Sequence, residues 1–154
     1  MGTSTDGILA YGYNLGGEDG GFEVAETNEY GGLKLGWLAE DDDSMGAAQD
    51  RLLAAAGFTE TDWQADGYFE RKRAAEESLG VQFDIYCSDG CPLYILAAKV
   101  ITVSRGYVEP IDMTELVEAP NVNGWDAKLA AALSTLGLTP KQEKPAWLLC
   151  SYWG

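Results

Sequence analysis

The segment Leu93–Val103 most constrains the fold, because it is apolar at almost every position rather than at alternate ones. Such a strand is apolar on both faces, which is typical of a strand buried in the middle of a sheet. Just before it, Ser88-Asp89-Gly90 provides strong turn chemistry, since Gly can take the left-handed position of a three-residue hairpin loop. The sequence therefore predicts a β-hairpin over residues 81–104, with arms Val81–Cys87 and Leu93–Ser104.

Two further strands are predicted near the ends of the chain, at residues 8–15 and 146–153, because both segments are rich in aromatic and branched side chains. Weaker strand patterns cover residues 22–26 and 33–38. The second of these is also consistent with an irregular connection.

Several helices are predicted where a capping residue or a glycine precedes apolar residues at helical spacing. They are expected at Met45–Ala56, at Tyr68–Leu79, after the capping box Asp112–Glu115, from Asn123 to Leu136, and as a short turn at Thr139-Pro140. The sequence thus predicts one α+β domain spanning residues 1–154, with a largely antiparallel sheet packed against three to four helices.

Negative charge is concentrated at the start of the chain. The first fifty residues contain a single cation, Lys34, and hold ten of the fifteen net negative charges. Their eleven carboxylates are Asp6, Glu18, Asp19, Glu23, Glu26, Glu29, Glu40, Asp41, Asp42, Asp43 and Asp50. A local field of this kind attracts basic surfaces and repels nucleic acid and acidic membranes.

The absence of histidine narrows the chemistry that the chain can perform. It removes histidine general bases, Ser-His and Cys-His nucleophile pairs, and histidine ligands for zinc. Two motif-like segments also fail on particular residues. The glycine-rich loop after residue 15 contains Glu18 and Asp19 and no nearby cation, which is wrong for a phosphate loop. An EF-hand that begins at Asp41 would have Leu52 at its twelfth position, where a bidentate acid is required.

The three cysteines do not form a metal motif. Cys87 and Cys91 flank the predicted turn, and a three-residue loop would place them opposite one another, within reach of a disulfide. In a reducing cytoplasm such a bond is disfavoured, so we interpret both residues, and Cys150, as reduced thiols, with a redox pair as the alternative. The sequence predicts neither a metal site nor a cofactor.

The candidate binding site lies in the acidic N-terminal third. Part of the Asp41–Ser44 run is explained by capping of the helix that follows. Local structure does not explain the other carboxylates, and an exposed Trp37 beside them would supply an apolar anchor with an acidic rim. The predicted partner-binding residues are Glu18, Asp19, Glu23, Glu26, Glu29 and Trp37.

Four segments together resemble a group of small acidic hypothetical proteins of actinobacteria and their phages. They are Asp6–Gly17, Ala56–Trp63, Tyr94–Ala97 and Trp147–Gly154, and the resemblance covers almost the whole chain. It implies a bacterial or phage cytoplasm, and it implies no activity, because that group has no established one.

These observations favour a non-catalytic protein that binds a basic protein partner, with a phage-type inhibitor or nucleic-acid mimic as its narrower form. The alternative is a small carboxylate-based enzyme or a domain that binds a divalent metal or another ligand. Direct nucleic-acid binding is not expected, because the only basic run, Arg71–Arg73, is short and surrounded by acids. No membrane segment is predicted, and a cytoplasmic location is expected.

Overall fold

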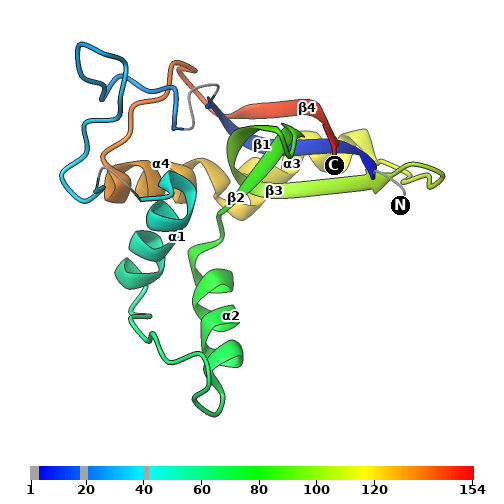
Figure 1. Ribbon diagram of the computed structural model, residues 1–154. Coiled ribbons are helices and arrows are strands. Elements are labelled where there is room, and N and C mark those ends of the chain that lie inside the picture. The colour runs from blue at the N-terminus through cyan, green and yellow to red at the C-terminus, as the bar shows by residue number, and fades with distance from the viewer. Residues whose placement is uncertain (1–3, 18–20, 40–41) are drawn as a thin grey trace.

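Four strands form a sheet that closes on itself in the order β1-β3-β2-β4 (Figure 1). The computed structural model describes residues 4–17, 21–39 and 42–154. β1 (Thr5–Gly16) pairs antiparallel with β3 (Cys91–Ser104) and with β4 (Ala146–Trp153). β2 (Gln82–Ser88) pairs antiparallel with β3 and, at its last two residues, parallel with β4. This short parallel contact closes the ring of strands.

The predicted fold class is confirmed, since the described residues form a single-domain α+β protein with a mostly antiparallel sheet and four helices. The hairpin and both terminal strands form where the sequence places them. The hairpin turn is the exception, because Ser88 pairs with Cys91 across a two-residue loop, Asp89-Gly90. Cys87 therefore faces Pro92 rather than Cys91, and its backbone takes the left-handed conformation with φ 74°. All three cysteines are free thiols.

The inside of the closed sheet holds a small core of its own. Ile8, Ala10, Ile95 and Ala97 are buried there and are joined by partly buried side chains from β2 and β4. β1 also approaches β3 very closely at Gly12, where a Cβ atom would collide with the backbone of Leu96 and Ala97. Any other residue at position 12 would push the two strands apart.

The larger core lies between the outer face of the sheet and two helices. α1 (Ser44–Ala55) contributes buried Ala48 and Leu52, and α4 (Trp125–Leu136) contributes buried Leu129 and Leu136. α1 begins as predicted, because the Asp43 carboxylate caps it by accepting a hydrogen bond from the Gly46 N–H at 3.1 Å.

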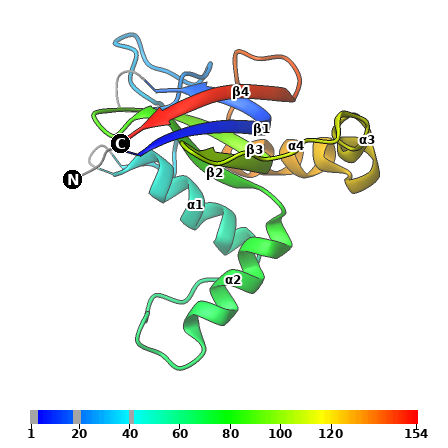
Figure 2. The same ribbon diagram turned by 90° about the vertical axis from the view of Figure 1, so that its right-hand side faces the viewer.

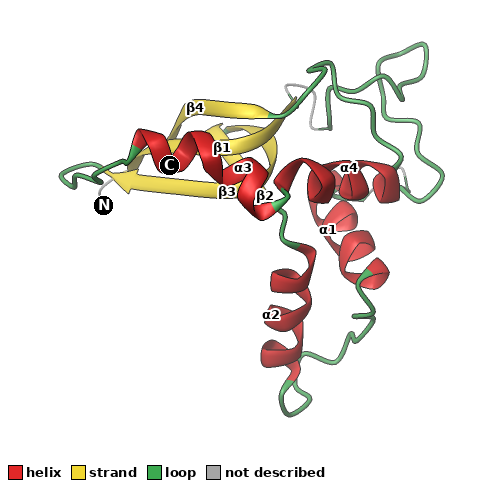
Figure 3. Ribbon diagram, turned by 180° about the vertical axis from the view of Figure 1, so that it is seen from behind, coloured by secondary structure: helices red, strands yellow, loops and turns green. Residues whose placement is uncertain are grey.

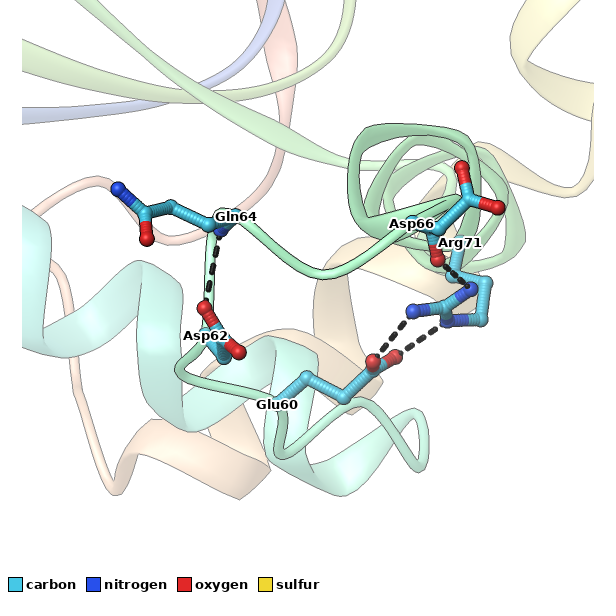
Figure 4. Close-up of polar contacts among 5 residues, drawn as sticks. All are labelled: Glu60, Asp62, Gln64, Asp66 and Arg71. Atoms are coloured by element: carbon cyan, nitrogen blue, oxygen red, sulfur yellow. Dashed lines mark hydrogen bonds and ion pairs between the residues drawn. The ribbon is translucent and has the colours of Figure 1, made fainter.

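α2 (Tyr68–Leu79) projects away from the sheet, as Figures 1 and 2 show. The Arg71 guanidinium holds the preceding loop by donating to both carboxylate oxygens of Glu60, at 2.6 and 2.7 Å, and to the Asp66 carbonyl at 2.9 Å (Figure 4). A cleft of about 450 Å³ between α1 and α2 has an apolar floor that includes Leu52 and Val81.

α3 (Met113–Asn123) lies over the sheet on the side that Figure 3 presents, and a narrow contact holds it there. Its Pro120 has no N–H, so the carbonyl of Leu116 lacks the usual donor four residues later. The Trp147 indole N–H of β4 donates to this carbonyl instead, at 3.0 Å. Every residue of α3 is exposed or only half-buried.

Three smaller expectations are wrong. Asn123 ends α3 rather than capping α4, since the left-handed Gly124, at φ 64°, joins the two helices. The predicted turn of helix at Thr139-Pro140 is extended, because the Thr139 carbonyl accepts the Ala25 N–H and Pro140 bridges to Val24. Residues 22–26 and 33–38 make only isolated bridges, and 33–38 is the irregular connection considered as its alternative.

No helix within the described residues has the length and apolar character that crossing a bilayer requires.

Candidate partner-binding site

The acidic N-terminal loop folds against the connection between α4 and β4, and Figure 1 shows these blue and orange segments side by side. The Ala25 N–H donates to the Thr139 carbonyl at 3.0 Å, and Val24 bridges to Pro140. Buried Phe22 stacks on Phe83 of β2, with ring centroids 5.6 Å apart. The predicted site residues in this loop are therefore held by tertiary contacts.

Glu26 is part of this attachment. Its carboxylate accepts the Thr139 backbone N–H at 2.9 Å and the Thr139 hydroxyl at 2.5 Å. Partial burial raises the pKa of Glu26, but the hydrogen bonds from Thr139 outweigh it, so the pKa is lowered overall and the carboxylate stays ionised. This charge joins two loops and presents little to an outside partner.

Glu23 lies at the same boundary but keeps its exposure. Its carboxylate pairs with the Lys141 ammonium at 2.7 Å, and both side chains remain more than half exposed. An exposed pair of this kind contributes little to stability, so either group can change partners at small cost.

Trp37 packs into the molecule rather than standing out from it. Its indole N–H donates to the Leu136 carbonyl at 2.8 Å, and the ring packs against the main core. The Arg51 guanidinium lies 5.6 Å from the centre of this ring and donates to the Thr135 carbonyl. The Trp37 indole therefore supplies a donor to a backbone carbonyl at the C-terminal end of α4. Trp37 does not form the exposed anchor that the sequence predicts.

The exposed aromatic residue of this region is Tyr30, which sequence reasoning missed. It stands at the tip of a tight turn, residues 28–32, with 88 % of its surface exposed and Glu29 exposed beside it. The Asn28 side chain accepts the N–H groups of Tyr30 and Gly32, at 2.9 and 3.0 Å, and the Asn28 carbonyl accepts the Gly31 N–H. We call residues 28–32 the tip loop.

The signal for the tip loop was present in the sequence as Asn28 followed by Gly31-Gly32, which is typical turn chemistry. An aromatic residue inside such a turn has little chance of reaching the core. Glu18 and Asp19, the remaining predicted site residues, lie outside the described part of the chain. Of the predicted residues that the structure describes, Glu29 is the one that the tip loop presents.

A different pair of carboxylates bears on the ligand-binding alternative. Asp6 and Asp84 both line a cleft of about 300 Å³, together with Thr102 and Tyr152. A metal site of three or more acidic, cysteine or histidine ligands is not found among the described residues. The cleft therefore has two carboxylates and two hydroxyl groups, without a third ionised ligand among the residues that line it.

No protein-family model matches the chain, and neither curated proteins nor solved structures give a match to it.

Proposed function

We propose that this chain is a non-catalytic binding protein that recognises a basic protein partner through its tip loop. The observation that carries the proposal is the presentation of Tyr30, which the Asn28 hydrogen bonds hold outward beside Glu29. An aromatic residue on a preorganised turn loses little conformational freedom when it binds, so such residues are frequent interface anchors.

The charge of the chain supports a basic partner. With a net charge of −15, the protein attracts a cationic surface over several ångströms and repels an acidic one. Glu29 adds short-range pairing at the tip loop, and the exposed Glu23 carboxylate, which can exchange its Lys141 partner, adds a further negative group in the same acidic segment. In the narrower form of this proposal, these carboxylates stand where the partner normally binds phosphates, and the protein is an inhibitor that competes with nucleic acid.

The test begins with immobilised protein and an actinobacterial lysate, followed by purification of the captured proteins and affinity measurement at low and high salt. Tyr30→Ala is expected to weaken binding by at least about tenfold, which is the effect of losing an interface anchor. Glu29→Gln is expected to lower the association rate and the salt dependence while leaving the fold unchanged.

Two matched variants control for general effects of losing an exposed aromatic ring or a charge. Trp63→Ala removes an exposed ring on the loop before α2, and Glu70→Gln removes an exposed acid in α2. Binding that Trp63→Ala weakens as much as Tyr30→Ala, or that salt does not affect, would contradict the proposal. Displacement of the captured partner by its own nucleic acid would support the competitive form, and simultaneous binding of both would exclude that form.

A further inference from the structure

A second candidate site is the cleft of about 300 Å³ that Asp6 and Asp84 line, which we call the ring cleft. Its lining residues come from all four strands and from the start of α1, so it belongs to the ring of strands and not to the surface loops. β2 and β4 pair only at the last two residues of each strand, so the earlier residues of β2 do not pair with β4. A cleft of this volume is at the small end of the range for small-molecule sites.

The two carboxylates reach the ring cleft from opposite strands. In the order β1-β3-β2-β4, β3 lies between Asp6 and Asp84 on one side of the ring and β4 on the other. Side chains alternate along a strand, so Asp6 shares the inner face of β1 with Ile8, and Asp84 shares that of β2 with Tyr86. Both aspartates are half-buried. Two like charges thus face the same interior, which is unfavourable while no cation lies between them.

Neither carboxylate has a cationic partner within the described residues. No Lys or Arg lines the ring cleft, and the two ion pairs found in the described ranges involve neither Asp6 nor Asp84. Asp6 accepts a hydrogen bond from the Ser4 hydroxyl at 3.1 Å, and Asp84 accepts one from the Ile85 N–H at 2.9 Å. An ionised carboxylate can accept more hydrogen bonds than this, so both groups can still bind the donors of a ligand.

The remaining walls of the ring cleft indicate which kind of cation fits. Ile8, Phe83 and Ile85 line it together with Tyr152, so most of the wall is aliphatic or aromatic. Divalent metals such as Ca²⁺ and Mg²⁺ require about six or more oxygen ligands, which such walls do not supply. An organic ammonium ion is better matched, because its head pairs with carboxylates and is attracted by aromatic rings, while its stem covers apolar side chains.

We propose that the ring cleft binds a small organic cation, an ammonium group carried on an apolar stem. The ammonium head lies between Asp6 and Asp84, and the stem lies against Phe83 and Ile85. This ligand site is separate from the tip loop and does not depend on the proposed function. Because the net charge of −15 attracts any cation to the molecule, the experiment separates general attraction from binding in the ring cleft.

The probe is hexylammonium, and hexanol is its neutral control because it has the same stem without a charge. Isothermal titration calorimetry at constant ionic strength measures both affinities, and the amide shifts of isotope-labelled protein in NMR spectra locate the ligand. Hexylammonium is expected to bind at least about tenfold more tightly than hexanol. Its amide shifts should centre on residues 6–8 and 83–85, which line the ring cleft from β1 and β2.

Two double variants test the carboxylates. Asp6→Asn/Asp84→Asn keeps the size of both side chains and is expected to weaken hexylammonium binding at least about tenfold without changing the affinity for hexanol. Asp50→Asn/Glu143→Gln removes the same charge from two exposed positions outside the ring cleft, and it should change the affinity by less than about twofold because solvent and salt screen those charges. Circular dichroism checks that both variants are folded.

Four outcomes would overturn the inference. They are equal weakening by the two double variants, equal affinity for hexylammonium and hexanol, amide shifts confined to residues outside the ring cleft, and displacement of hexylammonium by Mg²⁺ or Ca²⁺ at equal or lower concentration. The last of these would indicate a metal site instead. Tyr30→Ala should leave hexylammonium binding unchanged, so failure of this inference and failure of the proposed function are distinguishable.

Discussion

Tyr11 shows how one residue links the sheet to the helices. Its ring lies 5.6 Å from that of Trp125 and 5.4 Å from that of Trp147, and its hydroxyl donates to the Asp126 carboxylate at 2.6 Å. Burial, and after it the hydrogen bond to Asp126, raises the pKa of Tyr11 to about 12. The folded protein therefore keeps this proton at a pH where the unfolded chain has lost it.

That difference predicts a loss of stability in alkali. Between pH 10 and about 12 the folded state binds more protons at Tyr11 than the unfolded state, so the free energy of unfolding falls as pH rises. Tyr11→Phe is expected to lower the free energy of unfolding by about 1 kcal/mol near neutral pH, because one hydrogen bond is lost. In this variant the free energy of unfolding should also fall less steeply as pH rises above 10. Urea denaturation at several pH values measures both effects.

The exposed Tyr107 provides a control for loss of a tyrosine hydroxyl, and Tyr107→Phe should leave the free energy of unfolding near neutral pH unchanged. If the free energy of unfolding falls equally steeply above pH 10 in the wild type and in Tyr11→Phe, then a group other than Tyr11 causes the loss of stability in alkali. The pKa values of Tyr13 and Tyr94 are also raised, mainly by burial, so some slope should remain in the variant.

Trp37 and Tyr30 show why exposure was hard to predict for single residues. Both are aromatic residues in an acidic, glycine-rich loop, and local sequence does not separate them. Trp37 is half-buried because its indole reaches Leu136, a contact between residues 99 positions apart. Tyr30 is exposed because of a local turn around Asn28. The turn that exposes Tyr30 can be seen in the sequence, whereas the contact that partly buries Trp37 depends on the tertiary fold.

At the scale of elements, the attachment of α3 depends on a proline and a tryptophan that act together. Pro120 removes the donor that the Leu116 carbonyl would normally have, and Trp147 supplies another from β4. The two residues should therefore be energetically coupled, because each determines what the other contributes.

A double-mutant cycle tests this coupling. Trp147→Phe leaves the Leu116 carbonyl without its donor, whereas Pro120→Ala introduces a backbone N–H at position 120 that can restore a helical hydrogen bond. Trp147→Phe is therefore expected to cost about 1 kcal/mol less in the Pro120→Ala background than in the wild type. Urea denaturation of the four proteins measures the difference. The same cost in both backgrounds would show that Trp147 acts only through packing.

The elements that were predicted correctly have strong local signals. α2 has the bounds expected from the glycines that flank it, and β4 has the bounds expected from its apolar pattern after Pro145. In the segments that were predicted wrongly, the backbone conformation is set by contacts with residues far away in the sequence. Thr139 does not start a helical turn because the Ala25 N–H takes its carbonyl, and Val24 pairs only with Pro140, in an isolated bridge. Neither contact can be predicted from the residues that surround these positions in the sequence.

At the scale of the whole molecule, closure of the sheet brings the two ends of the chain together. The Ser4 N–H donates to the Gly154 carbonyl and the Gly154 N–H to the Ser4 carbonyl, at 2.5 and 3.0 Å. The Tyr152 hydroxyl donates to the Asp89 carboxylate near the point where β2 meets β4. β2 and β4 are paired only at Cys87–Tyr152 and Ser88–Trp153, so the ring of strands is closed at this one end.

The net charge of −15 opposes folding as well as self-association, because the compact state brings the carboxylates closer together. Only two ion pairs are found within the described residues, Glu60–Arg71 and Glu23–Lys141, and both are solvent-exposed. Salt should therefore screen more repulsion than attraction. The melting temperature is expected to rise as NaCl increases from about 20 mM to about 500 mM, over which the screening length becomes shorter than the spacing of surface charges.

A variant with Glu70, Glu77 and Glu143 replaced by Lys has less repulsion and should show a weaker salt response, because all three positions are exposed. Replacement of the same residues by Gln removes half as much charge and should give an intermediate response. The comparison separates screening of repulsion from a general effect of salt on burial of apolar surface, which would be the same in all three proteins. A melting temperature that falls with salt would instead mean that the two ion pairs outweigh the repulsion among the carboxylates.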